Sequence, residues 1–418
     1  MRAQWMRLGA SGMLAAGLIA CLPASAQPAD DPLGASAEGL IAAGRQLSPA
    51  LRAASLKTAA VAAKAEGADA LDDPTVTDSY TYYKDPGVFS AHTVTFSQAF
   101  PLWGKRDLRR DAAFTDIDAA RGQEQAVGDE LDEKIKVAYA QYYLISHDLA
   151  VNREIGDLAR RLRAAAAARY GQGGGDQTAV IQANSEETSI KIEAVRLEGD
   201  KNAARARLNA LVGRPGDAPL AEPLRLRPIP AAAPDVASLL DRARAANPTL
   251  SSSNAAVAAA KSRSTLADKA WYPDVVVGAG PLIQTNNRPV GFAATVGINI
   301  PISWGREASG QHEAAALVGA AQQKYEASVE EIEGALGEAV AGLRAAHQTE
   351  VLLRNQAMPQ AEAAYRTVLA DYGQGKGTLT TAIEAEHQMH EVDLRVLQAQ
   401  LDQQVQLAAI ERLIGGDL

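Results

Sequence analysis

The sequence is poor in aromatic residues and nearly free of cysteine. Phe, Trp and Tyr make up 5% of its 418 residues, and Cys21 is its one cysteine. Large globular cores usually depend on aromatic side chains, so their scarcity, together with abundant alanine, favours long helices packed closely side by side. A single cysteine excludes disulfide bonds within the chain, and loss of Cys21 with an N-terminal signal would exclude thiol chemistry as well.

Long apolar runs, catalytic motifs and an excess of positive charge are also missing. Beyond residue 26, no uninterrupted apolar stretch approaches the ~20 residues that a membrane-spanning helix needs. The sequence contains no nucleophile elbow, phosphate-binding loop or H-E-x-x-H helix. Its formal net charge of −9 gives no electrostatic reason to expect nucleic-acid binding. We therefore expect no enzyme, no cofactor and no nucleic-acid partner.

The first 26 residues are typical of an export signal. Two arginines accompany the mostly apolar stretch 8–22, and Ala-Ser-Ala at 24–26 fits a cleavage site. Residues 18–21 also resemble a lipobox, in which Cys21 would be lipidated, so signal cleavage and lipoprotein processing both stay open. An exported chain without a membrane-spanning helix is periplasmic, secreted, or inserted in the outer membrane as β-strands.

The chain repeats itself at an offset of about 200 residues. The sequence Y-G-Q-G-G-G-D-Q-T-A-V-I-Q-A, which begins at Tyr170, aligns without gaps on Y-G-Q-G-K-G-T-L-T-T-A-I-E-A, which begins at Tyr372. Further landmarks recur in the same order: Pro49 and Pro248, Pro74 and Pro273, and Gly213 and Gly415. We infer two copies of one unit, residues 37–213 and 236–415.

Each copy predicts the same order of helices and strands, and the fold class is mainly α with a small β contribution. In the first copy we expect helices at 37–72, 105–170 and 177–213, with two strands within about 75–103. In the second copy we expect helices at 236–271, 307–372 and 379–414, with two strands within about 273–303. The linker between the copies, residues 214–235, contains six prolines and cannot be helical.

The strand segments alternate between apolar and small or polar residues. In the segment 290–300, one face would carry Phe292, Ala294, Val296, Ile298 and Ile300. The other face would carry Ala293, Thr295, Gly297 and Asn299. This pattern is typical of a membrane barrel with lipid outside and water inside, and also of an ordinary half-buried hairpin.

The helix after each strand pair is about twice as long as the helix that returns from it. The segment 105–170 would span ~98 Å, and its apolar residues follow a coiled-coil seam. That seam comprises Val127, Leu131, Ile135, Ala138, Tyr142, Ile145 and Leu149. The returning helices would span only ~55 Å, so two shorter helices stacked end to end would match one long partner. Such an arrangement suits the wall of a tall cylinder.

Closure of the strands would require more than one chain. One chain supplies four strands, which cannot close a barrel, and an open strand edge in lipid is very costly. Three chains would supply twelve strands. A membrane location therefore implies a homotrimer with a 12-strand barrel.

Several motifs together resemble the outer-membrane factors of the TolC type. They are Asn247-Pro248-Thr249-Leu250, Ser97-Gln98-x-x-Pro101-x-x-Gly104-Lys105-Arg106 and the two Tyr-Gly-x-Gly segments. The resemblance covers nearly the whole chain after the signal, and the second motif looks most like the heavy-metal and cation efflux branch.

This resemblance implies a trimeric channel in the outer membrane with a large periplasmic helical tunnel. The tips of the tunnel would dock onto a periplasmic adaptor, which connects to an inner-membrane pump of the resistance-nodulation-division type. Candidate docking residues are Tyr170, Gly171, Gly173, Gly175, Tyr372, Gly373, Gly375 and Gly377. The glycines could equally serve only to close the helical hairpins, and both roles are compatible.

Two further clusters follow the second tip. Glu384 and Glu386 could form carboxylate rings at a narrow periplasmic aperture, or belong to a solvated helix face. His387, Met389 and His390 could suggest a metal site, but no cysteine or further histidine lies nearby in the sequence, so we expect an ordinary polar helix surface and no metal. The alternatives to a channel are a periplasmic adaptor and a structural coiled-coil protein of the envelope.

Overall fold

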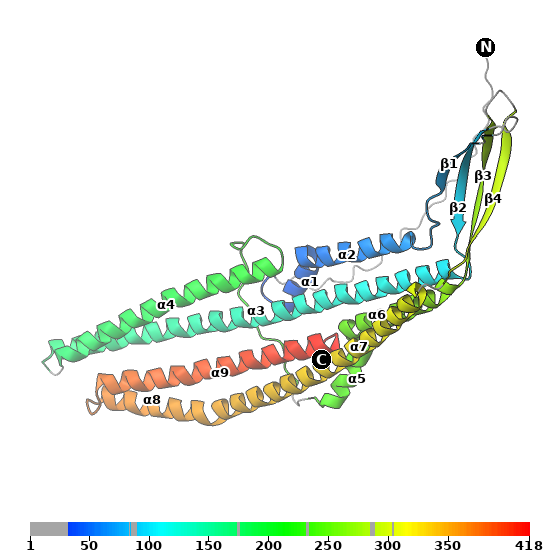
Figure 1. The fold of residues 1–418 in the computed structure, drawn as a ribbon. Coiled ribbons are helices and arrows are strands. Elements are labelled where there is room, and N and C mark those ends of the chain that lie inside the picture. Colours follow the sequence, from blue (N-terminus) through cyan, green and yellow to red (C-terminus); the bar gives the residue numbers. More distant parts are fainter. Residues whose placement is uncertain are drawn as a thin grey trace, which may run out of the picture.

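The computed structural model describes residues 32–418, except for residues 83, 85–89, 174–175, 231–233, 285–288 and 303–304. The expected signal and Cys21 lie outside the described residues. The molecule is elongated: a small sheet stands at one end, and two helical hairpins extend to the other end (Figure 1).

The sheet joins the two copies of the repeat. It has four antiparallel strands in the order β1 (Thr75–Thr81), β2 (Ala91–Phe100), β3 (Asp274–Gln284) and β4 (Gly291–Asn299). The pairing of β2 with β3 connects the first copy to the second, and β1 and β4 form the two edges.

The register gives the sheet one mainly apolar face, which also carries Gln98 and the paired Asp78 and His92, and one face of mostly small and polar residues. Val296 stands opposite Val277, and Phe96 stands opposite both Val76 and Ala279. On the same face, Tyr80, Ile283, Phe292 and Ile298 are exposed large hydrophobic residues. The other face carries Thr77, Ser79, Thr93, Thr95, Ser97, Gly278, Thr295 and Gly297. This alternation agrees with the pattern of the sequence, and the apolar face is uncovered in the single chain.

The first hairpin is organised around one very long helix. Helix α3 (Lys105–Gly171) has 67 residues, which span ~100 Å. Helices α2 (Pro49–Glu66) and α4 (Gln177–Leu211) pack along it in succession. Five residues of the expected seam are buried, namely Leu131, Ile135, Ala138, Tyr142 and Leu149, and Val127 and Ile145 are partly buried.

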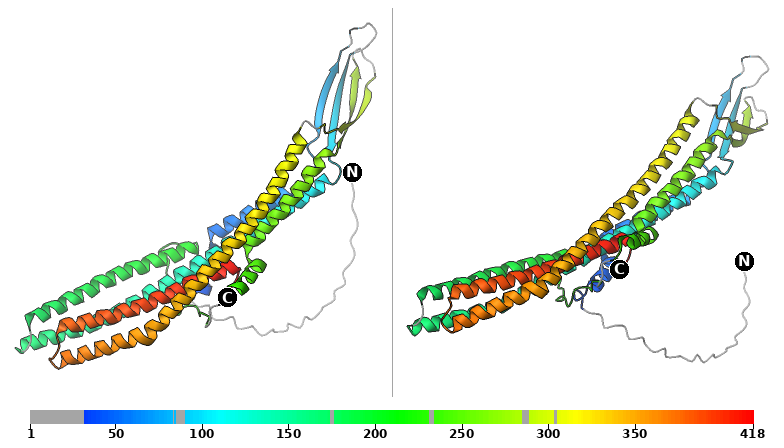
Figure 2. Two further views of the ribbon diagram at one scale, coloured as in Figure 1. Left: turned by 60° about the horizontal axis from the view of Figure 1, so that its bottom comes forward. Right: turned by 90° about the horizontal axis from the view of Figure 1, so that it is seen from below.

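The second hairpin repeats this plan with a bend. Helices α7 (Arg306–Leu352) and α8 (Met358–Gly373) are joined by a π-helical segment (Leu353–Ala357) where a single helix over 307–372 was expected. Pro359 has no backbone N–H to donate to the preceding turn, which explains the local widening of the helix. Helices α6 (Pro248–Asp268) and α9 (Leu379–Ile414) pack along this bent column, and Figure 2 shows both hairpins running side by side to their tips.

The helices expected at 37–72 and 236–271 are each divided. Helix α1 (Ala37–Leu47) ends before α2, and helix α5 (Val236–Ala246) ends before α6, which a short 3₁₀ turn (Lys269–Trp271) follows. Each break precedes a proline at the first position of the next helix, because proline disfavours helical geometry in the residue before it. Leu40 of α1 and Leu239 of α5 enter separate apolar clusters at mid-height of the molecule.

The stacked helices meet at two equivalent joints. At the end of α4, Gly213 has a φ of 74°, and a Cβ there would lie 2.8 Å from the carbonyl oxygen of Leu47. At the end of α9, Gly415 has a φ of 71°, and a Cβ would lie 2.5 Å from the carbonyl oxygen of Ala246. Both joints therefore require glycine for its backbone conformation and for the close approach of the next helix.

Asn247 links three helix ends at the second joint. Its backbone N–H donates to Ala243 O at the end of α5. Its side-chain Oδ1 accepts hydrogen bonds from the backbone N–H groups of Thr249 and Leu250, at 2.8 and 3.0 Å, at the start of α6. Its Nδ2 donates to Leu413 O in the last turn of α9, at 2.9 Å. One buried side chain thus satisfies polar groups that the two stacked helices would otherwise leave unpaired.

A buried charge cluster holds the two copies and the linker together at the same height. Lys136 of α3 donates to Glu411 of α9 and to Asp417, each at 2.8 Å, and Arg227 of the linker lies 2.7 Å from Glu411. The described linker residues, 214–230 and 234–235, form no helix or strand. Because Lys136, Arg227 and Glu411 are at most 10% exposed, removal of Glu411 would leave the poorly solvated charge of Arg227 without its carboxylate partner.

The two joints provide a matched test of Asn247. We expect Asn247→Ala to lower the free energy of unfolding by about 2 kcal/mol, because it removes a helix cap and leaves buried backbone groups unpaired. Ser48 occupies the equivalent position before Pro49 and, within the described part of the chain, makes no side-chain capping bond, so Ser48→Ala should change stability little. Thermal unfolding in detergent measures both, and equal effects of the two substitutions would contradict the assigned role of Asn247.

Candidate functional site

The two hairpin tips lie next to each other at the end farthest from the sheet. The chain reverses with a positive φ at Gly173 in the first tip and at Gly375 in the second. Asp176 caps the start of α4, and Thr378 caps the start of α9. Gly175, one of the predicted docking residues, lies outside the described residues.

The two tip tyrosines occupy equivalent repeat positions but different environments. Tyr170 is 49% exposed, whereas Tyr372 is 8% exposed. The Arg169 guanidinium lies 5.4 Å from the centre of the Tyr372 ring and donates a 3.2 Å hydrogen bond to Tyr372 O. Tyr372 therefore joins the second tip to the first, and Tyr170 is the tyrosine accessible to a partner.

The contact between the tips has a small apolar core. Ala166, Ala183, Tyr372 and Leu379 form a buried cluster, and a cavity of about 310 Å³ opens beside it. Gly171, Gly173 and Gly373 face open space, since a Cβ at any of them would meet nothing within 4 Å among the described residues. Gly377 packs more closely, with a Cβ position 3.2 Å from Tyr372 N. The surface at Gly171, Gly173 and Gly373 is thus open to another chain.

The two acidic residues expected at an aperture do not share a helix face. Glu384 is exposed, but Glu386 is buried between the hairpins and cannot line water in this arrangement. Residues two apart on a helix point in very different directions, which explains the separation. The expectation that both residues face one aperture is not compatible with this packing.

The two histidines after the second tip also point to different partners. His387 Nε2 lies 2.8 Å from Glu186 Oε1 of α4, and His390 Nε2 lies 3.8 Å from Asp148 Oδ1 of α3. Met389 is partly buried between them. Burial raises the pKa of Asp148 despite the opposing effect of His390. The sequence did not indicate Glu186 or Asp148, because each lies more than 200 residues from its partner and no local pattern marks the pairing.

Glu350 attaches the bent column of the second hairpin, which α7 and α8 form, to α9. Its carboxylate accepts hydrogen bonds from Gln403 at 2.6 Å, Gln400 at 2.8 Å and Arg354 at 2.8 Å. Burial alone would raise the pKa of Glu350, but these three donors outweigh burial and lower it. Since Glu350 precedes the π-helical segment by one turn, it holds the column at the point where the bend begins.

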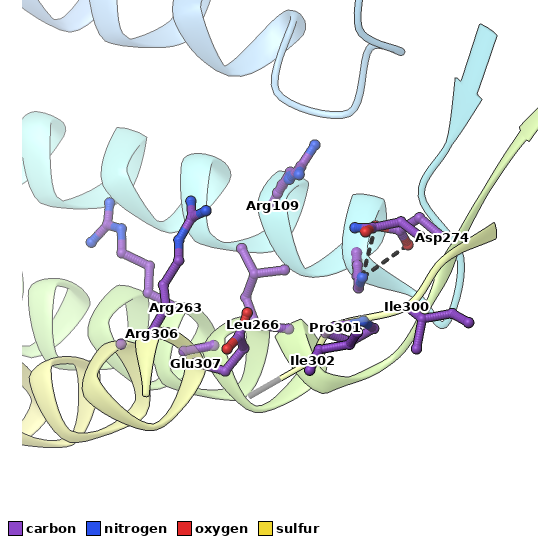
Figure 3. Close-up of a pocket in the computed structure, with 14 residues that line it drawn as sticks. Arg109, Arg263, Leu266, Asp274, Ile300, Pro301, Ile302, Arg306 and Glu307 are labelled. Atoms are coloured by element: carbon purple, nitrogen blue, oxygen red, sulfur yellow. Dashed lines mark hydrogen bonds and ion pairs between the residues drawn. The ribbon is translucent and has the colours of Figure 1, made fainter. Parts of the chain in front are cut away.

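A second candidate site lies where the helices meet the sheet. A cavity of about 740 Å³ is lined by Arg109 of α3, Arg263 of α6 and Arg306 of α7, together with Ile300 and Pro301 (Figure 3). Asp274 and Glu307 also line the cavity, and Arg263 already pairs with Asp116, so the lining carries charges of both signs.

Beside this cavity, Lys105 secures the start of α3 to the sheet. Lys105 Nζ lies 2.8 Å from both carboxylate oxygens of Asp274 and donates to Tyr272 O, also at 2.8 Å. The dashed lines in Figure 3 mark the contacts with Asp274. Lys105 belongs to the Gly-Lys-Arg motif noted in the sequence, and Gly104 before it has a φ of 74°. The motif therefore shapes the turn from strand to long helix.

Comparison with known proteins identifies a family. The sequence profile described as "Outer membrane efflux protein" matches residues 40–214 and 239–416. No curated protein matches the chain at a significant level. None of the described helices is both long enough and apolar enough to span a membrane.

Solved structures share the fold over nearly the whole chain. Crystal structures of CusC have a TM-score of 0.76 and 17% identity, covering 91% of this chain and 92% of that chain. The outer membrane protein VceC from Vibrio cholerae has a TM-score of 0.75 and 21% identity, covering 91% and 96%. The open MtrE outer membrane channel from Neisseria gonorrhoeae has a TM-score of 0.71 and 18% identity, covering 93% and 91%. At these identities the likeness shows a common fold.

The lowered pKa of Glu350 predicts a specific pH dependence. A carboxyl group with a lowered pKa in the folded state stabilises the protein above its unfolded pKa of about 4.3, and this contribution is lost as the pH falls through the folded pKa. We expect Glu350→Gln to cost about 1.5 kcal/mol at pH 7, with the difference from wild type shrinking between about pH 5 and pH 3.

Melting temperatures across this pH range, measured in detergent, test the prediction. Glu362→Gln is the matched control, because Glu362 pairs with Arg366 on the surface of the same column. A Glu350→Gln deficit that does not change with pH would refute the assignment.

Proposed function

The chain belongs to the outer membrane efflux protein family, and on this premise we propose that it is the outer-membrane channel subunit of a tripartite efflux system. The observation that carries the proposal is the sheet with one exposed apolar face at the end of a long helical body. A periplasmic adaptor or a structural coiled coil has no need of such a face. CusC forms a transmembrane channel and MtrE is an outer membrane channel, which supports the same location for this chain.

The functional unit in this proposal is a homotrimer. The edge strands β1 and β4 present unpaired backbone groups, which lipid cannot satisfy. Pairing β4 of one chain with β1 of the next, three times around, closes twelve strands. The exposed apolar side chains, such as Phe292 and Val296, then contact outer-membrane lipid, and the small polar face lines a water-filled lumen.

The hairpin tips are the proposed docking surface for a periplasmic adaptor. Tyr170 offers an exposed aromatic side chain, and the surrounding glycines leave room for another backbone to approach. The adaptor connects the channel to an inner-membrane pump, for which the sequence resemblance favours the resistance-nodulation-division type. Heavy-metal or cation export is the substrate class favoured by the same resemblance, and it remains a prediction.

Paired substitutions on the two faces of β4 test the barrel. We expect Val296→Lys to prevent stable insertion, because a charge on the lipid face costs about 2–4 kcal/mol at the bilayer midplane. Thr295→Lys places the same charge toward the lumen and should insert normally while shifting ion selectivity toward anions. The measurements are trimer yield from outer membranes and conductance in planar bilayers. A soluble, non-conducting monomer for the wild-type chain would contradict the channel assignment.

Substitution of the exposed tip tyrosine tests docking. We expect Tyr170→Ala to reduce several-fold the adaptor that co-purifies with the tagged channel from native membranes, because it removes an aromatic contact. Tyr170→Phe keeps the ring and should retain the adaptor. Since Tyr170 is half-exposed, trimer stability should not change in either variant. Unaltered adaptor recovery with Tyr170→Ala would place the docking surface elsewhere.

A further inference from the structure

Three side chains that could bind a metal converge between the two hairpins, about ten residues above the tips. Glu186 comes from α4, and Glu386 and His387 come from α9. His387 Nε2 lies 2.8 Å from Glu186 Oε1 and 3.8 Å from Glu386 Oε2, and one donor atom from each residue lies within 4.8 Å of the others.

The donor atoms and their spacing suit a divalent transition metal. Imidazole nitrogen and carboxylate oxygen are ordinary Zn²⁺ ligands at about 2.0–2.2 Å. Ligands of a tetrahedral ion at that distance lie roughly 3.3 Å apart, a value between the two separations around His387. Small side-chain rotations would therefore suffice, and three protein ligands would leave one position for water.

The carboxylate of Glu386 is largely removed from solvent at this position. Its side chain is 7% exposed, and its Oε1 is buried with no hydrogen-bond partner among the described residues. The buried hydroxyl of Tyr365 on α8 is also without a hydrogen-bond partner within the described structure. A bound cation would compensate the carboxylate charge.

We propose that Glu186, Glu386 and His387 bind one divalent transition-metal ion per chain, with Zn²⁺ as the best-fitting ion, and that this ion ties the first hairpin to the second. The site needs ligands from helices about 200 residues apart in the sequence, so it can form only when α4 and α9 are packed together. His390 is not a ligand, because it faces Asp148 of α3.

The internal repeat shows that these ligands are not a by-product of duplication. At the offset of 202 residues, Glu386 and His387 correspond to Asn184 and Ser185, and Glu186 corresponds to Gln388. None of these three counterparts is a common zinc ligand. The three donor residues therefore come together where α4 and α9 of the same chain meet, and the equivalent positions of the repeat lack them.

Metal titration of the full-length channel in detergent tests the site. We expect calorimetry to show one Zn²⁺ per wild-type chain, and Zn²⁺ to raise the melting temperature. Glu186→Gln, Glu386→Gln and His387→Gln should each weaken binding at least about tenfold and abolish the thermal shift. Glu384→Gln and His390→Gln are matched controls from the same helix and should stay within about twofold of wild type. Equal losses in the controls, or no wild-type binding, would overturn the proposal.

Spectroscopy of the wild-type protein covers the case in which a variant fails to fold. Co²⁺ bound in place of Zn²⁺ should give the visible absorption of a four-coordinate ion, and X-ray absorption should show one nitrogen with oxygen ligands. An octahedral, all-oxygen ion would show binding elsewhere on the acidic surface and would refute this site.

Discussion

The end-to-end joints between stacked helices are the constraint on which the rest of the molecule depends. One ~100 Å helix can be matched by two shorter helices only if their ends meet, and helix ends carry unpaired N–H and C=O groups. Gly213 and Gly415 let the ends of the stacked helices approach closely enough. Asn247 forms hydrogen bonds with backbone groups of both helices at its joint. With the joints in place, each copy forms one continuous layer of packed helices from the sheet to the tip.

An elongated layer of helices has little interior, so the buried contacts that stabilise it are concentrated at mid-height of the molecule. The two main apolar clusters and the Lys136–Glu411–Arg227 charge cluster all lie there, where α1, α5 and the linker cross the long helices. Buried ion pairs contribute little net stability but strongly disfavour arrangements that separate their partners. The charge cluster therefore fixes the position of one copy relative to the other. The relative position of the two tips depends on this arrangement.

The sequence predicts the parts of this fold that depend on local periodicity. The alternation in β4, the seam of α3 and the glycine reversals follow from spacings within a few residues, and the two copies follow from the self-similarity of the sequence at an offset of about 200 residues. The division of 37–72 and 236–271 was missed, although Pro49 and Pro248 were recognised as landmarks, because a proline can begin a helix as well as interrupt one. The burial of Glu386 and the contact of His387 with Glu186 depend on the rotation of one hairpin against the other, which no local pattern encodes.

Duplication makes the two hairpins equivalent, and the places where they differ are where specific chemistry can reside. In the second copy, the column formed by α7 and α8 bends at Pro359 and is held by Glu350, whereas α3 of the first copy runs without a π segment. The second tip buries its tyrosine against the first, and the metal-binding donors converge on its returning helix. The first difference acts within the second hairpin, and the other two act at contacts between the hairpins. The contact between the hairpins therefore depends on side chains whose counterparts in the other copy lie in a different environment, as Tyr372 and Tyr170 show.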